Sequence, residues 1–482
     1  MTRSPRFPLR DLCAPVAAAL LVLVAVLVGR HIQDTRHTLF VNWPPLFAVW
    51  EPHVGPGTPA AVGMAVATVG YGPALAARLP WRALLASAWA AAMAWIWSLA
   101  LIDGWRRGVA GRLTTREEYL RVIGRFADIP DTLRDFTHHI VAGSPDPWPA
   151  HVAGHPPGAT LTFVLLDRIG LRGGGWAGVW CITVGATACV AVLVAVRALA
   201  DERLARRAAP FLVLAPAAVW LGASADAYFA AVAAWAVALL ALAVTGGSPW
   251  PAAGSGLLFG LTCYLSYGLT LFAVIAAAVL LLGRHRVRER PSLLAALVAG
   301  LAVVPAAFTL AGFDWWEGYR LLVTRYYQGV GGVRPYGYWV WANLACTVVC
   351  TGPATAAGLA RVGGTLARRH GAALSGPDVG GRPDGGGPEG GGPEGGGPDG
   401  GGPDGGGGPD AAGRLALLVA AALLALLVAD VSGMSKAETE RIWLPFAMWL
   451  LASCAFLGRP RRWLAAQAVL ALLVNHLLLT GW

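Results

Sequence analysis

Charged residues are scarce in this sequence. Only 13% of its 482 residues are Asp, Glu, Lys or Arg, whereas 56% are hydrophobic and the mean hydropathy is +0.57. This composition excludes an ordinary soluble protein and indicates a polytopic helical membrane protein. Acidic residues are the scarcer kind, because 27 Asp and Glu stand against 37 Lys and Arg, for a net charge of +10. Basic loops that face anionic lipid head groups account for this excess.

The sequence also lacks the patterns of several other protein classes. Its seven cysteines all lie in or beside apolar runs, so no disulfide framework is indicated. No cluster of basic and aromatic residues suggests nucleic acid as a partner, and no clear internal repeat of the kind found in transporters is present. No small-residue cleavage site clearly follows the first apolar run, Ala14–Gly29. We therefore interpret this run as an uncleaved span that follows a cytoplasmic N-terminus.

Apolar runs of membrane-spanning length predict an all-α bundle of about thirteen spans in the cytoplasmic membrane. The predicted spans are 14–29, 57–79, 82–103, 174–196, 208–222, 227–245, 251–265, 269–283, 292–312, 338–360, 414–430, 442–457 and 463–481. They divide the chain into N-terminal spans (1–81), a core (82–362) with an outer loop at 104–156, a linker (363–413) and a three-span block (414–482). Within the linker, GGGPE and GGGPD units over 376–410 lack the apolar residues that a core needs, so we predict an acidic, disordered cytoplasmic segment.

The positions of basic loops predict one unusual helix. Loops at 197–207, 284–290, 361–369 and 459–462 all fall on the cytoplasmic side only if the run Ala159–Leu171 does not cross fully. A helix of its length reaches about 20 Å, short of a hydrocarbon core of about 30 Å. We therefore expect a re-entrant or short helix after the outer loop. The alternative is a cytoplasmic loop, which its seven arginines between Arg106 and Arg134 favour.

A His-Pro-Pro-Gly stretch at 155–158 joins the long loop to this run. Proline removes a backbone donor and fixes φ, and the residue before it is pushed out of helical geometry. His155 is therefore held on a stiff segment at the membrane edge, which favours a binding site. The alternative is a plain helix start, because proline is common in the first turn of a helix.

Several polar residues share one membrane face if the loop at 104–156 is outside. Asp103 ends a span, Glu117, Glu118 and Tyr119 lie in the loop, Asp226 lies between two spans, and Arg441 adjoins an apolar span. Ionisable residues at a membrane are costly and are functional candidates. Each has a structural alternative: Asp103 as a boundary residue, Glu117 and Glu118 as a solvated helix face, Arg441 as a partner of lipid phosphate. The loop histidines lack ligand spacing with acids, so no metal site is predicted.

These residue types suit transfer from a lipid-phosphate donor. Such a reaction needs a carboxylate to deprotonate the acceptor hydroxyl and cationic groups to hold the leaving phosphate. We predict Asp103 or Glu118 as the base and His155 and Arg441 as phosphate ligands. The remaining substrate-binding candidates are Asp226, Glu117 and Tyr119.

At these positions the sequence resembles the GT-C superfamily of membrane glycosyltransferases, which use polyprenyl-phosphate sugars. The similar features are a span that ends in Asp103, the acid-containing stretch at Glu118-Tyr119, the His155-Pro-Pro segment, Pro216 with a polar turn at Asp226, and the stretch Arg441–Pro445. The stretches HPPG and ERIWLPF also resemble those of multi-spanning membrane proteins from high-GC actinomycetes. The resemblance covers roughly residues 82–457.

The resemblance implies a GT-C-like fold and sugar transfer with inversion at the sugar carbon. It implies a polyprenyl-phosphate-linked sugar as donor, a lipid or glycan acceptor of the cell envelope, and membrane lipid as the surroundings, and some superfamily members use a divalent cation. The chain departs from the pattern at Gly158, where HPPL is usual, and in the absence of a paired acid beside Asp103. A transporter or lipid flippase and a non-catalytic membrane scaffold are the alternative functions.

Overall fold

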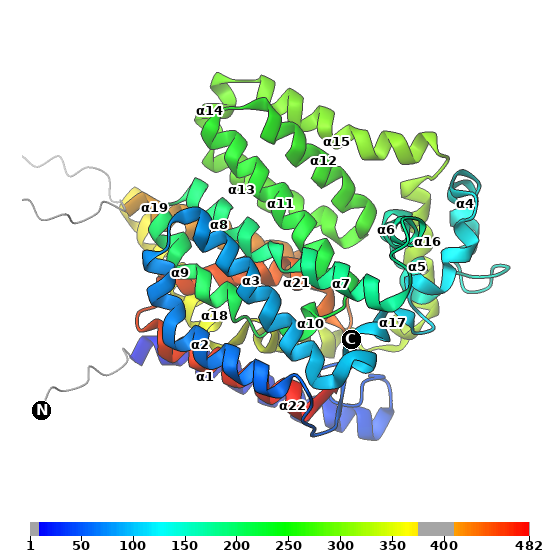
Figure 1. Cartoon of the computed structure of the whole chain (residues 1–482), viewed down its shortest axis with the longest axis horizontal. Helices are drawn as coiled ribbons and strands as arrows, with labels where there is room; N and C mark the ends of the chain where they lie inside the picture. The colour runs from blue at the N-terminus through cyan, green and yellow to red at the C-terminus, as the bar shows by residue number, and fades with distance from the viewer. Residues whose placement is uncertain (1–8, 375–408, 482) are drawn as a thin grey trace, which may run out of the picture.

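The computed structural model describes residues 9–374 and 409–481, which fold into an all-α bundle (Figure 1). Among these residues, eight helical segments are long and apolar enough to cross a membrane. They are α1 (Leu9–Arg36), α2 (Thr58–Arg78), α3 (Trp81–Ala100) with η1 (Leu101–Asp103), α7 (Gly173–Gly185) with α8 (Thr187–Leu199), α11 (Ala225–Gly246), α15 (Ser292–Leu310), α18 (Tyr336–Leu374) and α19 (Pro409–Val431). The length and apolar composition of these helices indicate a membrane protein, and a helix also satisfies its own backbone hydrogen bonds, as a membrane interior requires.

Shorter or less apolar helices run among these eight. They are α9 (Glu202–Val213) with α10 (Ala218–Leu221), α12 (Pro249–Leu265), η6 (Tyr267–Leu271) with α13 (Phe272–Leu282), α21 (Leu444–Leu450) with η7 (Leu451–Phe456), and α22 (Pro460–Leu477). Connecting helices among them are α14 (Arg284–Glu289), α16 (Trp315–Gln328), α17 (Val330–Val333) and α20 (Thr439–Ile442). The all-α class is thus confirmed, whereas the count of about thirteen spans stays a prediction.

The long loop at 104–156 is folded. It contains η2 (Arg106–Ala110), η3 (Arg112–Thr114), η4 (Tyr119–Phe126), α4 (Ile129–Asp135), η5 (Phe136–His139) and α5 (Ala150–Ala153). Trp148 forms its centre, because the buried indole packs on the rings of Phe126 and Phe136 and donates a hydrogen bond of 2.9 Å to the Phe136 carbonyl. Aromatic burial of this kind holds the loop together, and Phe136 also packs on Phe313, outside the loop.

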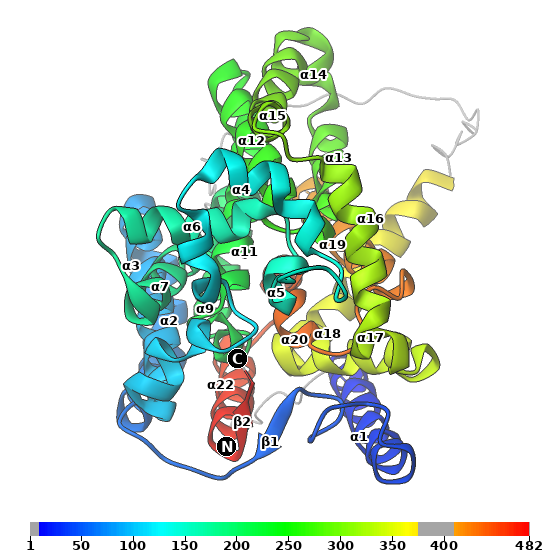
Figure 2. The ribbon, with the colours of Figure 1, turned by 90° about the vertical axis from the view of Figure 1, so that its right-hand side faces the viewer.

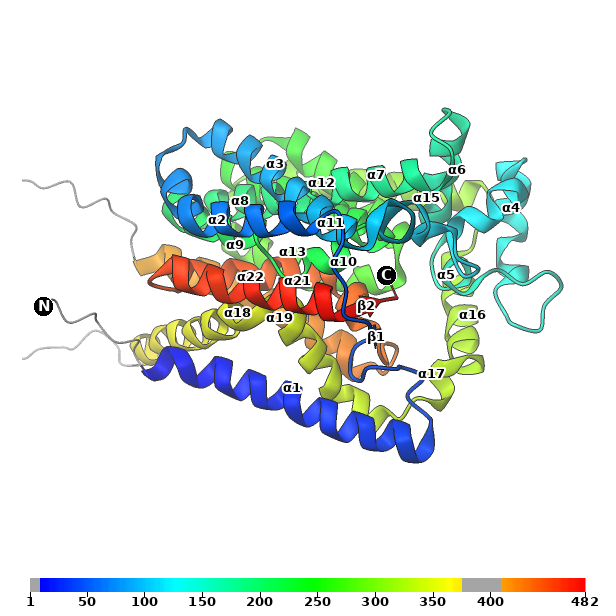
Figure 3. The ribbon, with the colours of Figure 1, turned by 60° about the horizontal axis from the view of Figure 1, so that its bottom comes forward.

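A short helix, α6 (Pro157–Arg168), follows the loop, as the sequence predicted. Its 12 residues correspond to about 18 Å. Figures 1 and 3 show α6 lying across one end of the bundle and not along it. Gly158 lets the helix approach α12, because a Cβ at this position would lie 2.5 Å from the Tyr264 carbonyl oxygen. The departure from HPPL at Gly158 therefore has a packing reason.

The two ends of the bundle differ in character (Figure 3). We call one the polar end; it gathers loop 104–156, the turn at 223–226, α16, α17 and the segment 432–443 (Figure 2). At the opposite end, Arg206 donates to the Leu79 carbonyl at 2.8 Å, Arg207 donates to the Leu457 carbonyl at 2.8 Å, and Arg361 pairs with Asp11 at 2.6 Å. The loops that the positive-inside rule assigned to one side thus lie together.

Residues 37–57 cross the polar end. They connect the N-terminal part of the described chain to its C-terminal part through a pair of short strands. Their strand β1 (Ala48–Trp50) pairs antiparallel with β2 (Leu478–Thr480), with Val49 opposite Leu479. The sequence predicted a span over 463–481, but the structure ends helix α22 at Leu477 and places the next three residues in this strand. Pairing between segments this far apart leaves no local pattern.

Helix α18 is interrupted inside its apolar stretch. Gly352 has a φ of +79°, a left-handed conformation that glycine adopts without strain, and Pro353 follows it. The buried Gln467 of α22 satisfies the freed backbone groups, because its Nε2 donates to the Thr351 carbonyl at 2.7 Å and its Oε1 accepts from the Ala354 N–H at 3.4 Å.

The helices extend into both ends of the predicted linker, 363–413. Helix α18 continues to Leu374 and α19 begins at Pro409, while the remaining residues, 375–408, lie outside the described chain. Helix α19 packs against α13, α18 and α21. The residues after the linker therefore share one core with those before it.

Candidate functional site

A chain of four ionisable side chains, three of them buried and one, His151, partly buried, lies at the polar end. Arg441 pairs with Asp226 at 2.6 Å, and its other terminal nitrogen lies 3.5 Å from His151 Nε2. His151 Nδ1 lies 2.9 Å from Glu118 Oε1. Asp226, Glu118 and Arg441 are each only 4% exposed. Three segments that lie far apart in the sequence thus build a single charge network: the loop at 104–156, the first turn of α11 and α20.

The turn before α11 positions Asp226. Ser224 is the N-cap of this helix, and its hydroxyl accepts a hydrogen bond from the Asp226 N–H at 3.2 Å. Ala223 precedes it with a φ of +52°, a left-handed conformation that costs a non-glycine residue about 1 kcal/mol. The Asp226 carboxylate also lies in the first turn of the helix, where the positive end of the helix dipole stabilises it.

The hydrogen-bond partners of His151 define its tautomer. A guanidinium only donates, so Nε2 of His151 is the acceptor on the Arg441 side. Nδ1 therefore carries the proton and donates a hydrogen bond to the Glu118 carboxylate. The His151 ring thus connects the carboxylate of Glu118 to the guanidinium of Arg441.

The surroundings keep both ends of this network ionised. Burial opposes the charge of Arg441, but the carboxylates of Asp226, Glu438 and Glu118 outweigh burial and raise its pKa above the usual range. Burial likewise raises the pKa of the Glu118 carboxyl, but the interaction with His151 and the charge of Arg441 lower it overall. Glu118 is therefore a carboxylate at neutral pH, which is the form that accepts a proton.

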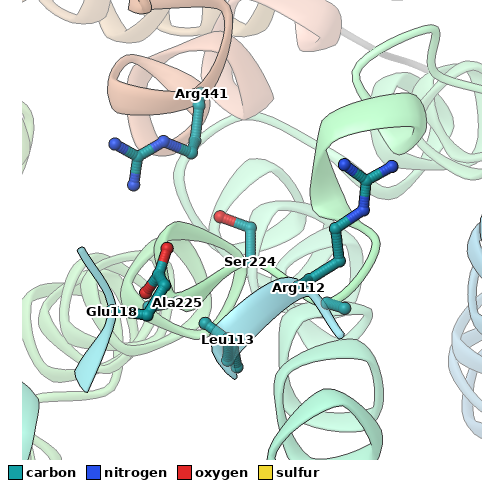
Figure 4. Close-up of a pocket in the computed structure, with 7 residues that line it drawn as sticks. Arg112, Leu113, Glu118, Ser224, Ala225 and Arg441 are labelled. Carbon is teal, nitrogen blue, oxygen red and sulfur yellow. The ribbon is translucent and has the colours of Figure 1, made fainter. Parts of the chain in front are cut away.

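A small pocket lies beside these residues (Figure 4). It has room for about one water molecule. Its lining consists of Arg112, Leu113, Glu118, Ala223, Ser224, Ala225 and Arg441. Figure 4 shows the Glu118 carboxylate, the Ser224 hydroxyl and the Arg441 guanidinium turned toward one another, while the Arg112 guanidinium points away. Glu118 Oε2 is buried and has no hydrogen-bond partner among the described residues.

Asp103 belongs to a neighbouring cluster. Its two oxygens lie 2.8 Å from His53 Nε2 and 2.8 Å from an Arg112 nitrogen, and Arg107 lies 3.6 Å away. Arg112 also donates to the Thr480 carbonyl at 2.8 Å. Asp103 therefore binds Arg112, whose side chain lines the pocket, and does not itself line the pocket. The two candidates for the catalytic base, Asp103 and Glu118, thus lie in different clusters.

His155 and Tyr119 lie next to the network, but His155 does not have the positive charge expected of a phosphate ligand. His155 Nδ1 lies 2.7 Å from the His151 carbonyl, which only accepts, so Nδ1 is protonated, and the Tyr119 hydroxyl lies 3.1 Å from the same nitrogen. The rings of Tyr119 and Phe229 pack against the imidazole. Burial lowers the pKa of His155 to about 4, so the imidazole is neutral and supplies no positive charge to a phosphate.

Glu117 lies apart from these residues. Its side chain is 40% exposed, pairs with Arg116 at 2.9 Å and accepts from the Ala150 N–H at 3.0 Å. It ties the loop to α5, and it does not line the pocket. The interpretation of Glu117 as part of a solvated face fits this position, whereas the same interpretation does not fit the buried Glu118.

Six residues build the network and the polar lining of the pocket. From the sequence, three of them were predicted to have a role: Glu118, Asp226 and Arg441. His151 was noted among the loop histidines, and Arg112 and Ser224 were not selected. For Ser224 a local signal exists, because a Ser two residues before an Asp at the start of an apolar run is typical of a helix N-cap. Arg112 has no such signal.

A second buried carboxyl lies beside Arg441. Glu440 is fully buried; its Oε1 accepts from the Phe47 N–H at 2.8 Å, and its Oε2 has no partner among the described residues. Burial raises the pKa of Glu440 to about 7. The contact with Phe47 connects α20, which carries Arg441, to the segment 37–57.

Within residues 9–374 and 409–481, no group of three or more His, Cys, Asp or Glu side chains has an arrangement that could hold a metal ion. Comparison with known proteins gives no match to a family model and no significantly similar curated protein.

Proposed function

We propose that the protein is a membrane glycosyltransferase of the GT-C type, which moves a sugar from a polyprenyl-phosphate donor to a hydroxyl of a lipid or glycan acceptor. The observation that carries this proposal is the arrangement of Glu118 and Arg441. A buried, ionised carboxylate, one of whose oxygens has no partner in the described part of the chain, faces a buried guanidinium across a small pocket. A proton acceptor beside a fixed cation is what transfer from a phosphate-linked donor requires.

In this proposal Glu118 is the general base. Its Oε2 accepts the proton of the acceptor hydroxyl, while its Oε1 stays bound to His151. Asp103 is the weaker candidate, because both of its oxygens already bind cationic or hydrogen-bonding partners. We therefore assign Asp103 the role of holding Arg112 at the edge of the pocket.

Arg441 stabilises the negative charge that develops on the leaving phosphate. Asp226 holds the guanidinium in place through their 2.6 Å contact. Because the His155 imidazole is neutral, its contribution to substrate binding is a hydrogen bond and not a charge. Tyr119 fixes the orientation of that ring through its hydroxyl and its edge-on packing.

The membrane arrangement that accompanies this function has thirteen crossings. The eight long apolar helices supply most of them, and the shorter helices α9–α10, α12, α13, α21–η7 and α22 supply the rest. Helix α6 then stays at the polar end, with the basic loops on the cytoplasmic side and the site on the outer side. A lipid-linked donor presents its phosphate at that depth, next to α6 and the pocket.

The test of this function uses purified protein in lipid nanodiscs and a panel of radiolabelled polyprenyl-phosphate hexoses and pentoses, with detergent-extracted envelope lipids as acceptors. We expect sugar transfer by the unchanged protein and a loss of 10²-fold or more in Glu118→Gln, which removes the base. Glu117→Gln is the matched control, since it neutralises the adjacent carboxyl outside the pocket, and it keeps full activity.

The pH dependence adds a second readout. Because the pKa of Glu118 is lowered, the acid limb of the rate profile lies below the ordinary range of a glutamate, and activity persists at pH 5. Movement of radiolabelled donor across the bilayer without transfer to any acceptor would indicate a flippase instead. Full transfer activity in Glu118→Gln would remove this residue from the mechanism.

A further inference from the structure

The pocket beside Glu118 is too small for a sugar ring or a phosphate group. It has room for about one water molecule, and apolar residues (Leu113, Ala223 and Ala225) close its sides. Packed interiors do not yield by a whole ring without a large rearrangement. The group that enters the pocket is therefore a single oxygen with its hydrogens.

The polar groups of the pocket suit a hydroxyl oxygen. Glu118 Oε2 is an ionised acceptor that has no partner among residues 9–374 and 409–481, so it needs a hydrogen-bond donor. The Ser224 hydroxyl faces the same space; it accepts from the Asp226 N–H at 3.2 Å and donates to Asp226 Oδ2 at 3.5 Å, which leaves one lone pair of its oxygen for a further donor. An O–H group in the pocket supplies the donor that Glu118 Oε2 needs and lies beside the Ser224 oxygen.

We propose that this pocket is the subsite for the nucleophilic oxygen of the reaction, and that the protein therefore also hydrolyses its sugar donor when water occupies the subsite in place of an acceptor hydroxyl. This inference rests on the proposed function. It adds a second activity and identifies Ser224 as a ligand of the nucleophile. The donor phosphate and sugar lie outside the pocket, at its mouth.

The reaction balances without a further reagent. A water oxygen forms a bond to the anomeric carbon of the sugar, and the bond between that carbon and the phosphate oxygen breaks. The electron pair of the broken bond stays with polyprenyl phosphate, whose charge Arg441 stabilises, and the water proton passes to Glu118 Oε2. The products are a free sugar and polyprenyl phosphate.

Two features make water a competent nucleophile here. The carboxylate that activates a hydroxyl activates water in the same position, since both present one O–H to Glu118. The apolar contacts inside the pocket are limited to the side chains of Leu113, Ala223 and Ala225, and the space has no room for a longer acceptor to use them. Selection of acceptor over water thus depends on contacts outside the pocket.

The experiment supplies the nanodisc-embedded protein with polyprenyl-phosphate mannose and polyprenyl-phosphate glucose in ¹⁸O-labelled water, first without acceptor and then with extracted envelope lipids. We expect slow release of free sugar that carries ¹⁸O at the anomeric carbon, and suppression of this release by acceptor. Samples are quenched within minutes, because free sugars exchange this oxygen with water, and sugar incubated alone gives the background.

Three variants locate the activity. Glu118→Gln removes the base and lowers hydrolysis and transfer together by 10²-fold or more. Ala225→Val adds two methyl groups at the pocket wall without changing any charge, and we expect it to lower both activities at least 10-fold. Glu117→Gln leaves both unchanged. A monodisperse elution profile and an unchanged thermal midpoint show that each variant is folded.

The outcomes separate this inference from the proposed function. Transfer to lipid acceptors without ¹⁸O-labelled free sugar overturns the hydrolysis alone. Hydrolysis that survives in Glu118→Gln or Ala225→Val overturns the subsite, because the reaction then occurs elsewhere. If neither probe reacts with water or with any acceptor, both the proposed function and this inference fail.

Discussion

The ion pair of Arg441 and Asp226 allows a quantitative test of the site. At 2.6 Å and an effective dielectric constant of about 20, the attraction between the two charges is roughly 6 kcal/mol. Both side chains are almost fully buried, so each has also lost its hydration. Asp226→Asn removes one charge and leaves the other in place. Breaking a buried pair in this way typically costs about 3–5 kcal/mol.

We expect a loss near the lower end of that range, about 3 kcal/mol. Glu438 lies 3.8 Å from Arg441 and continues to compensate part of its charge. His151 also keeps its contact with the guanidinium, because that contact does not involve Asp226. A loss of this size corresponds to a change of roughly 10²-fold in the folding equilibrium.

The assay is denaturant titration of the protein in mixed micelles, followed by tryptophan fluorescence. The double variant Asp226→Leu/Arg441→Met removes both charges and should lose less stability than Asp226→Asn. The exposed pair of Arg134 and Asp131 is the control, and Asp131→Asn there should change stability by about 0–1 kcal/mol. A loss below about 1 kcal/mol in Asp226→Asn would refute the idea that the pair is buried and mutually dependent.

Three further predictions follow from the packing around the site. Gln467→Leu leaves the carbonyl and the N–H at the break in α18 without partners, so a loss of about 1–3 kcal/mol in the same denaturant titration is expected; no loss would mean that other groups satisfy them. Gly158→Ala forces α6 away from α12 and should lower the thermal midpoint by the equivalent of about 1–3 kcal/mol, and an unchanged midpoint would contradict the close contact. The pKa of Glu440 is raised to about 7, so its contribution to stability is complete below the ordinary glutamate pKa and is lost as the pH rises through 7. In Glu440→Gln, the free energy of unfolding should therefore no longer decline between pH 5 and 8. An unaltered decline would exclude Glu440 as its source.

Apolar periodicity predicted the helices well, because a membrane interior demands long runs without charge. The predicted span at 227–245 matches α11 (Ala225–Gly246), and that at 292–312 matches α15 (Ser292–Leu310). Errors occur where the backbone departs from a straight helix. The predicted span at 208–222 is divided into α9 and α10 around Pro216, since proline lacks the N–H that would continue the helix.

The site was predicted less completely, because its residues come from segments that only the tertiary structure brings together. Glu118 and Arg441 were selected for their chemistry, and the structure places both at one pocket. Asp103 looked equivalent to Glu118 from the sequence, since each is an acid beside an apolar segment. What separates them is the set of partners: Asp103 binds His53 and Arg112, whereas one oxygen of Glu118 has no partner among the described residues.

Several features that oppose stability lie at the same end of the molecule as the pocket. Ala223 adopts a left-handed conformation at the pocket wall, and Glu118 and Glu440 each bury an oxygen that no described residue binds. Each costs about 1–3 kcal/mol, and none is required to hold the helices together. At the opposite end, the arginines of neighbouring loops bind carbonyl groups and an aspartate directly. Because a fold retains such local costs where they serve an activity, their position is independent support for a site at the polar end.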